Sequence, residues 1–152
     1  MTSYFYKSPI GVLDIQSNGE YIYSIQLVIK FGKVNRNIPE IVRICFKQLS
    51  EYFSGERKAF DLKIKISGTE FQRKVWRQLL KISYGNTSTY GKIAQLIGNP
   101  NASRAVGMAN NKNKLILVIP CHRVVGSKGD LLGYVGGIPA KKYLLDMEKE
   151  YM

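Results

Sequence analysis

A cysteine and the chain's one histidine stand side by side at Cys121 and His122. The thiolate is the nucleophilic form of cysteine, and with an ordinary pKa of about 8.5 little of it exists at neutral pH. A base that takes the thiol proton would activate it. Neighbouring side chains of a strand point to opposite faces, so the pair needs a turn or a bridging water to cooperate, and Pro120 favours such a turn. The pair is either a nucleophilic site or two core residues that are neighbours by chance.

Other cysteine or metal chemistry has little support. The second cysteine, Cys45, lies in an amphipathic segment and fits a small core residue. Two cysteines and one histidine are too few for a structural zinc site, and a secreted disulfide framework would need more cysteines at closer spacing. We therefore expect no metal.

Charge is the second indication of function. The 152 residues carry a net charge of +12, and no acidic residue occurs between Glu70 and Asp130. The cations inside this segment are Arg73, Lys74, Arg77, Lys81, Lys92, Arg104, Lys112, Lys114, Arg123 and Lys128. Charge of one sign confined to one segment indicates a surface for a polyanion, and nucleic acid is the first candidate. On charge alone, the solvated surface of a thermophile's protein or of a basic proteome stays open.

The first 66 residues are expected to form a small α/β unit. Three segments rich in β-branched and aromatic residues are predicted as strands: 4–7, 12–16 and 21–29. A hairpin turn is predicted at Asn18-Gly19. A helix is predicted from Pro39 to Phe53, stopped by Gly55, and residues 60–66 alternate as one more strand.

From residue 67 the pattern becomes helical. Thr69 and Gln72 form a capping box ahead of an apolar face. That face consists of Phe71, Val75, Leu79 and Leu80. Further on, an apolar run over residues 115–119 leads to Cys121, and a glycine-rich loop over residues 126–137 precedes a last helix. This helix has Pro139 at its start and is expected to bury Tyr143, Leu144 and Met147.

Two short helices joined by a tight turn lie inside the basic segment. The first is capped by Ser88 or Thr89 and closed by Gly98. The second, residues 102–110, is expected to be capped by Asn101. This is a helix-turn-helix layout, which favours DNA binding, although helical hairpins are also common packing units.

The segment around the cysteine resembles a known family. Pro120-Cys121-His122-Arg123-Val124 is similar to the signature of the O6-alkylguanine-DNA alkyltransferases, or methylated-DNA–protein-cysteine methyltransferases. Other matches follow in order and spacing over most of residues 71–148: Tyr90, Arg104-Ala105-Val106-Gly107, Asn113, Gly133-Tyr134, Gly136-Gly137 and Glu148. The first third of the chain fits loosely.

The resemblance implies an α/β (α+β) fold. A small antiparallel sheet with a helix, ribonuclease H-like, would occupy residues 1–66, and a mainly helical DNA-binding and alkyl-transfer domain residues 67–152.

The resemblance also implies a reaction. An alkyl group of O6-alkylguanine, or of O4-alkylthymine, would be transferred once and irreversibly to Cys121, without a cofactor. His122 would relay the thiol proton through a water, and Glu148 would hold the imidazole in the useful tautomer. The other implied roles are Tyr90 and Lys141 as hydrogen-bond donors to the base, Asn113 as a brace of the active-site turn, and Tyr134 as a neighbour of the alkyl group.

The implied substrate is double-stranded DNA, from which the damaged nucleotide must be extruded. Arg104 resembles the family's finger that takes the place of the lost base. Small residues would let its helix approach the minor groove closely: Ala102, Ala105, Gly107 and Ala109. Arg123 is expected to be a further contact to the DNA.

Two positions depart from the family pattern. Val135 stands where many relatives carry serine, which removes one possible donor, and Lys114 replaces a proline after Asn113.

The alternative function is a non-catalytic alkyltransferase-like protein that binds the lesion, but such proteins carry tryptophan at the acceptor position. A plain DNA-binding regulator would leave the cysteine, histidine and glutamate unexplained, and a cysteine hydrolase would give Arg104 no role.

Location and assembly are inferred only coarsely. The first residues lack the apolar region of a signal peptide, and no stretch is long and apolar enough to span a bilayer, so no membrane partner is expected. We expect a monomer that works in the cytoplasm on chromosomal DNA.

Overall fold

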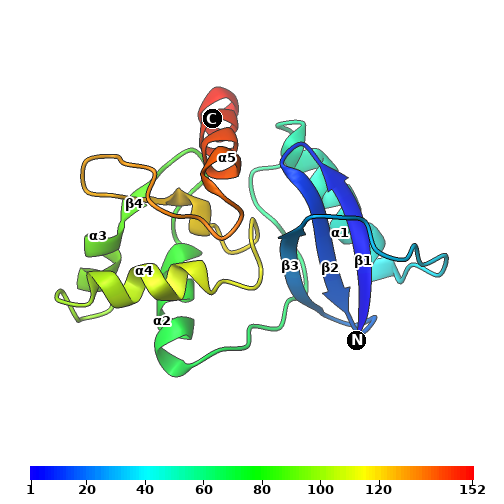
Figure 1. The fold of residues 1–152 in the computed structure, drawn as a ribbon, viewed down its shortest axis with the longest axis horizontal. Helices are drawn as coiled ribbons and strands as arrows, with labels where there is room; N and C mark the ends of the chain where they lie inside the picture. Colours follow the sequence, from blue (N-terminus) through cyan, green and yellow to red (C-terminus); the bar gives the residue numbers. More distant parts are fainter. The chain divides into compact units, whose positions relative to one another are not determined.

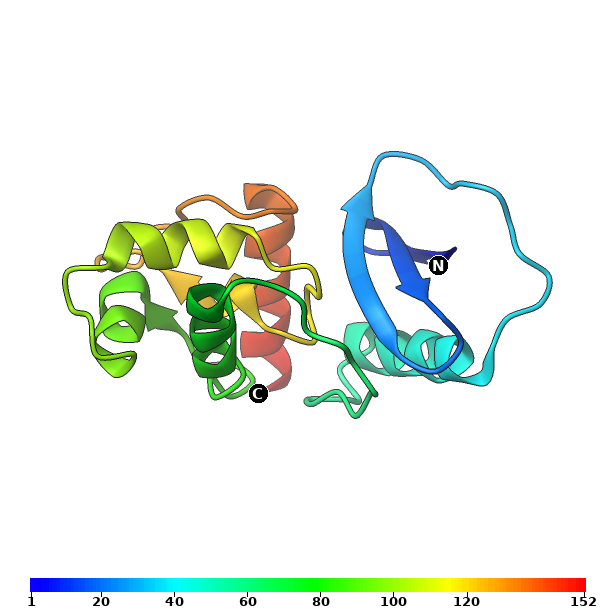
Figure 2. The same cartoon turned by 90° about the horizontal axis from the view of Figure 1, so that it is seen from below.

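The computed structural model describes all of residues 1–152, which form two compact units, Met1–Ile66 and Ser67–Met152. The mixed α/β fold class predicted from the sequence is confirmed. In the first unit, three antiparallel strands in the order β1-β2-β3 form a sheet. Its elements are β1 (Thr2–Ser8), β2 (Gly11–Ser17), β3 (Ile22–Val28) and the helix α1 (Glu40–Phe53). Figures 1 and 2 show α1 lying along one face of this sheet.

Alternation along the central strand sets the core of the first unit. Leu13 and Ile15 of β2 are buried, whereas the residues between them are only partly covered. Helix α1 buries Val42, Cys45 and Leu49, which recur at the three- or four-residue spacing of one helix face. Cys45 is therefore a core residue, and burial raises the pKa of its thiol to about 12.

The turn between β2 and β3 forms as the sequence predicts. The Asn18 Oδ1 accepts hydrogen bonds from the backbone N–H groups of Glu20 and Tyr21, both at 2.9 Å. Gly19 has a φ of 91°, which glycine adopts without strain. Asparagine supplies the local hydrogen bonds and glycine the backbone conformation, so this hairpin is fixed by two adjacent residues.

The strand predicted over residues 60–66 is wrong. Only Ile64 pairs with the sheet, in a single parallel bridge to Ile22. Gln48 of α1 explains the difference, because its side chain donates to the Asp61 carbonyl and accepts from the Asp61 N–H, both at 2.9 Å. A helix side chain thus satisfies the backbone groups that a longer strand would have paired.

The second unit is mainly helical, as predicted. Its helices are α2 (Glu70–Leu79), α3 (Tyr90–Leu96), α4 (Ser103–Asn111) and α5 (Ile138–Tyr151). Two short parallel strands, β4 (Ser88–Thr89) and β5 (Val124–Val125), pair with each other and were not predicted. Because β4 immediately precedes α3 and β5 follows Cys121–Arg123, this pairing fixes the start of α3 beside the cysteine turn.

The boundaries of the helix-turn-helix are close to those predicted. The Thr69–Gln72 capping box of α2 is present in both directions, and Thr89 caps α3. Asn101 does not cap α4. The Ala102 N–H donates to the Asn99 carbonyl at 3.0 Å and closes the turn, so the helix begins one residue later than expected.

Two residues expected in the core are instead exposed. Leu80 is 45% exposed and Tyr143 42% exposed, whereas Leu144 and Met147 of α5 are buried as expected. Trp76 fills the place between α2 and α4, where its Nε1 donates to the Ala109 carbonyl at 2.9 Å. Leu80 lies just past the end of α2, at its C-cap, and takes no part in this packing.

Candidate active site

The acceptor candidate, Cys121, is completely buried in the second unit. It begins a single 3-10 turn, Cys121–Arg123, directly after Pro120, so the chain does leave regular structure here. Its own N–H donates to the Ile119 carbonyl at 2.7 Å. Burial raises the pKa of the Cys121 thiol to about 11, although hydrogen bonds from Asn113 and Tyr134 and the charge of Lys141 act to lower it. The resting sulfur is therefore a thiol and needs a base before it can attack.

Asn113 braces the approach to the cysteine. This buried residue follows α4, and its Nδ2 donates to the Ile119 carbonyl at 2.8 Å while its Oδ1 accepts from the Leu115 N–H at 2.9 Å. Between these anchors Leu117 has a φ of 73°, a conformation that non-glycine residues rarely adopt. One side chain thus holds both ends of a strained apolar turn.

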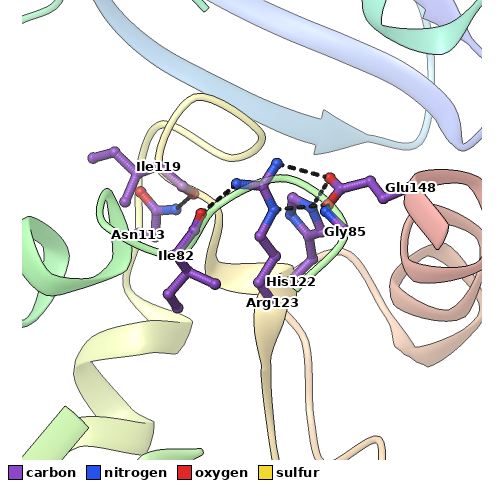
Figure 3. A network of polar contacts seen from close by, with 7 residues as sticks. All are labelled: Ile82, Gly85, Asn113, Ile119, His122, Arg123 and Glu148. Carbon is purple, nitrogen blue, oxygen red and sulfur yellow. Dashed lines mark hydrogen bonds and ion pairs between the residues drawn. The ribbon is translucent and has the colours of Figure 1, made fainter. Parts of the chain in front are cut away.

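Glu148 of α5 is the centre of the polar network drawn in Figure 3. Its Oε2 lies 2.6 Å from Nε2 of His122, and its Oε1 accepts from the Gly85 N–H at 3.1 Å. Arg123 donates from Nε to Oε1 at 2.7 Å and from Nη2 to Oε2 at 3.0 Å, and from Nη1 to the Ile82 carbonyl at 2.7 Å. The carboxylate therefore fixes the imidazole from one side while the guanidinium fixes the carboxylate.

The protonation states in this network follow from burial and from the partners. Burial lowers the pKa of His122, the contact with Glu148 acts against this, and the charges of Arg123 and Lys141 lower it further. Burial alone would raise the pKa of the Glu148 carboxyl, but the hydrogen bonds and charges of His122 and Arg123 outweigh it and hold that pKa well below its usual range. At neutral pH the imidazole is then a neutral base beside an ionised carboxylate.

Lys141 is oriented differently from the expectation that it donates to the base. Its ammonium is buried, and Nζ donates to the carbonyls of Val124, Leu132 and Gly133 at 2.5, 2.9 and 3.4 Å. An ammonium has three hydrogens, and these acceptors use all of them. Lys141 therefore fastens the glycine-rich loop to the chain just after the cysteine turn, and its charge reaches Cys121 without a direct bond.

Two tyrosines flank the sulfur. Tyr134 lies on the glycine-rich loop and is 8% exposed, and burial followed by the charge of Cys121 raises the pKa of its phenol well above the usual value. Tyr90 begins α3 and is half-buried, and burial and then the charge of Cys121 raise the pKa of its phenol. Both phenols thus stay protonated at neutral pH and can donate.

Comparisons with known proteins identify the family. The model of the 6-O-methylguanine DNA methyltransferase DNA-binding domain matches residues 70–150, and that of the ribonuclease-like domain of the same methyltransferases matches residues 1–66. The chain belongs to the methylated-DNA–protein-cysteine methyltransferase family. A relative of this name from Methanosarcina acetivorans is 44% identical over 150 residues, covering 94% of this chain and 95% of the relative. One from Mycobacterium leprae is 42% identical, covering 93% and 88%.

Solved structures of the family agree with the fold. The Mycobacterium tuberculosis O6-methylguanine methyltransferase is 39% identical, with a TM-score of 0.89 over 99% of this chain and 93% of that protein. The Mycobacterium tuberculosis OGT solved in complex with DNA is 40% identical, with the same TM-score over 98% and 93%. A Methanococcus jannaschii O6-methylguanine DNA methyltransferase is 28% identical, with a TM-score of 0.73 over 97% and 94%.

Within this methyltransferase, the residues expected to meet DNA separate into two groups. Arg104 and Ala105 lie exposed at the start of α4, and Ala102 and Gly107 are partly exposed. Ala109, in contrast, is 3% exposed and faces α2, where its carbonyl accepts from Trp76. Arg123 is also a correction, because it is 7% exposed and three of its nitrogens donate inside the core. Arg123 therefore serves the Glu148 network and has little surface left for a phosphate contact.

The sequence analysis missed several residues of the methyltransferase site. Gly85 and Ile82 contribute only backbone groups, and no side-chain pattern could have indicated them. Asn110, which is fully buried, lies three residues before Asn113, and that closeness in the chain was the one available signal. No cluster of three or more histidine, cysteine, aspartate or glutamate side chains is placed to hold a metal ion. No helix combines the length and the apolar character needed to cross a membrane.

Proposed function

We propose that this chain repairs alkylated DNA by moving an alkyl group from O6 of guanine to Sγ of Cys121. The Sγ–C bond forms as the C–O6 bond breaks, and the electron pair of the broken bond stays on the base. The thiol proton leaves through a water and His122, and a proton returns to the guanine, so the products are a thioether and an unmodified base. A thioether is stable, so each molecule reacts once, and no cofactor takes part.

The observation that carries this proposal is the arrangement of the cysteine, the histidine and the glutamate. Cys121 is a buried thiol that needs a base, and the next residue is a neutral imidazole whose Nε2 contacts Glu148 at 2.6 Å. In the tautomer that donates from Nε2, the lone pair is on Nδ1, which is the atom that would accept the proton. This nucleophile–base–orienter order matches the activity that the relatives' name states.

Charge developing on the departing base must also be stabilised. Tyr90 is the donor that we assign to the base, because its phenol stays protonated and its pKa responds to Cys121. Tyr134 would lie against the alkyl group. Lys141 would act through the loop and through its positive charge, because its hydrogens already have acceptors.

DNA is the proposed partner, as in the Mycobacterium tuberculosis protein solved with it. A base inside a duplex cannot reach a buried sulfur, so the nucleotide must be flipped out, with Arg104 taking its place in the stack. We propose O6-alkylguanine as the main lesion and O4-alkylthymine as a second one, repaired by a monomer. The proposed location is the cytoplasm, where the chain would act on chromosomal DNA.

Intact-mass analysis tests the proposal. The protein is incubated with a duplex that contains O6-methylguanine, and the modified residue is mapped. The expected result is the gain of one methyl group on Cys121, no gain in Cys121→Ala, and a normal gain in the control Cys45→Ala, whose cysteine lies in the core of the other unit. Unchanged mass with tight binding of the lesion would instead indicate a non-catalytic sensor.

A further inference from the structure

Asn110 is a buried polar residue with no part in the proposed reaction so far. It lies near the end of α4, and its Nδ2 donates to the carbonyl oxygen of Cys121 at 3.3 Å. Its Oδ1 is buried and accepts from no protein donor. Burying an amide with half of its hydrogen bonds unmade costs free energy, and a leucine of similar size would avoid that cost. Stability alone does not explain an asparagine at this position.

The bond to Cys121 complements the bond made by Asn113. Asn113 donates to the Ile119 carbonyl and Asn110 donates to the Cys121 carbonyl. The two amides therefore bind the backbone on either side of Pro120. Asn110 lies near the end of α4, and Asn113 follows two residues after the helix ends, so the same stretch of chain supplies both amides. The same helix carries Arg104 at its start. The backbone of the acceptor is thus fixed directly to the helix that is proposed to enter the DNA groove.

We propose that Asn110 is a positioning residue for alkyl transfer, because its hold on the Cys121 carbonyl sets where Sγ lies when it attacks. This inference rests on the proposed function. In-line displacement needs the reacting atoms about 3–3.5 Å apart and aligned, and a small misplacement of the nucleophile slows the reaction without weakening substrate binding. Asn113 fixes the approach to Pro120, and Asn110 fixes the residue that reacts.

The test uses the full chain and free O6-benzylguanine, which reacts without DNA. Asn110→Leu removes the donor at nearly constant volume, and Asn110→Ala is a second variant that cannot overpack the site. Asn111→Leu is the matched control, because Asn111 is the next residue of the same helix and is exposed. Three quantities are measured for each protein: the fraction that can be alkylated at long times, the first-order rate constant at saturation, and the half-saturating concentration.

For both Asn110 variants we expect an alkylatable fraction like that of the unmodified chain, an unchanged half-saturating concentration, and a rate constant lower by about tenfold, as expected for one lost buried hydrogen bond. Asn111→Leu should match the unmodified chain in all three. An unchanged rate constant in the Asn110 variants, or a loss confined to the alkylatable fraction, would overturn the inference and leave Asn110 a purely structural residue. If the unmodified chain is itself not alkylated, the proposed function fails instead.

Discussion

His122 and Glu148 meet through Nε2 and Oε2 at 2.6 Å, and neither side chain is reached by solvent. The contact joins a residue of the cysteine turn to the last helix of the chain. Because the carboxylate accepts from Nε2, the neutral imidazole carries its lone pair on Nδ1 and can act as a base in one direction only. The pH dependence of the reaction therefore reports on this pair.

The rate of reaction with free O6-benzylguanine should be nearly independent of pH from about 7.5 to 9.5. The pKa of Cys121 is raised to about 11 and that of His122 is lowered, so over this range the thiol is protonated and the imidazole neutral. The rate should fall only in acid, below the usual histidine pKa of about 6.5, where His122 becomes protonated. Single-turnover rates across this range are the measurement. A tenfold rise per pH unit would mean that free thiolate attacks without help from His122.

Glu148→Gln should lower the stability at neutral pH by about 3–5 kcal/mol, because Arg123 stays buried without its counter-charge. The folded-state pKa of Glu148 is depressed, so its contribution is complete above the unfolded carboxyl pKa of about 4.3 and is lost as the pH falls below it. Urea unfolding at pH 7 and pH 3.5 should therefore show a smaller difference between variant and unmodified chain in acid.

The control for this prediction lies on the same helix. Asp146 pairs only with Lys142 in the part of α5 that faces water, and both side chains are 65% exposed. Asp146→Asn should change stability by less than about 0.5 kcal/mol at either pH. An equal loss in both variants would mean that the effect comes from α5 itself and not from the buried network.

Arg104→Ala should slow the repair of duplex DNA far more than the reaction with free O6-benzylguanine. Only the duplex contains a base that must be replaced in the stack, and Arg104 is exposed at the start of α4. Arg43→Ala removes an exposed arginine from α1. It should leave the rates on duplex DNA and on free O6-benzylguanine unchanged. Equal losses on both substrates in Arg104→Ala would place this residue in the pocket or in the folding of α4.

Lys141→Met should loosen the glycine-rich loop. It leaves three carbonyls without their donor, at Val124, Leu132 and Gly133, and removes a positive charge near the sulfur. Limited trypsin digestion should then cut faster after Lys128, and alkylation by the free base should slow. Lys142→Met, an exposed neighbour, is the control. An unchanged cleavage rate at Lys128 would show that the loop is held by other contacts.

The sequence predicted well those features that adjacent residues determine. The Asn18-Gly19 turn, the Thr69–Gln72 capping box and the end of α3 at Gly98 all depend on hydrogen bonds or backbone conformations within a few residues. The adjacency of Cys121 and His122 is visible in the sequence, but the adjacency alone left open whether the two residues act together, and that stays a prediction. The strand predicted over 60–66 failed because its outcome depends on Gln48, a residue of another element.

The sequence did not predict how two buried cations are held. The resemblance implied that Lys141 donates to the base, and Arg123 was expected to contact DNA. Each is instead buried by partners distant in sequence, Glu148 for the arginine and the loop carbonyls for the lysine. The family resemblance pointed to Glu148 but not to the way in which Arg123 holds it, because the shape of that network exists only after α5 has packed.

Alkylation of Cys121 should destabilise the folded protein, and a benzyl group should do so more than a methyl group. Cys121 is 0% exposed, and the glycine-rich loop is fastened by Lys141. A methyl added to a tightly packed site costs about 1–3 kcal/mol through strained rotamers and backbone shifts. A thioether also cannot become a thiolate, so buried donors that would stabilise that charge are left less satisfied. For a chain of this size, each kcal/mol corresponds to roughly 2–4 °C in melting temperature.

An alkyl group that filled a void would stabilise the protein instead. Around Sγ, however, the group would compete with Asn113 and Tyr134 for the same space. The measurement is the melting temperature before and after stoichiometric reaction with methyl and benzyl donors, with DNA removed, and with Cys121→Ala carried through the same treatment. Alkylated protein that melts at the same temperature as the free protein, or higher, would contradict the prediction.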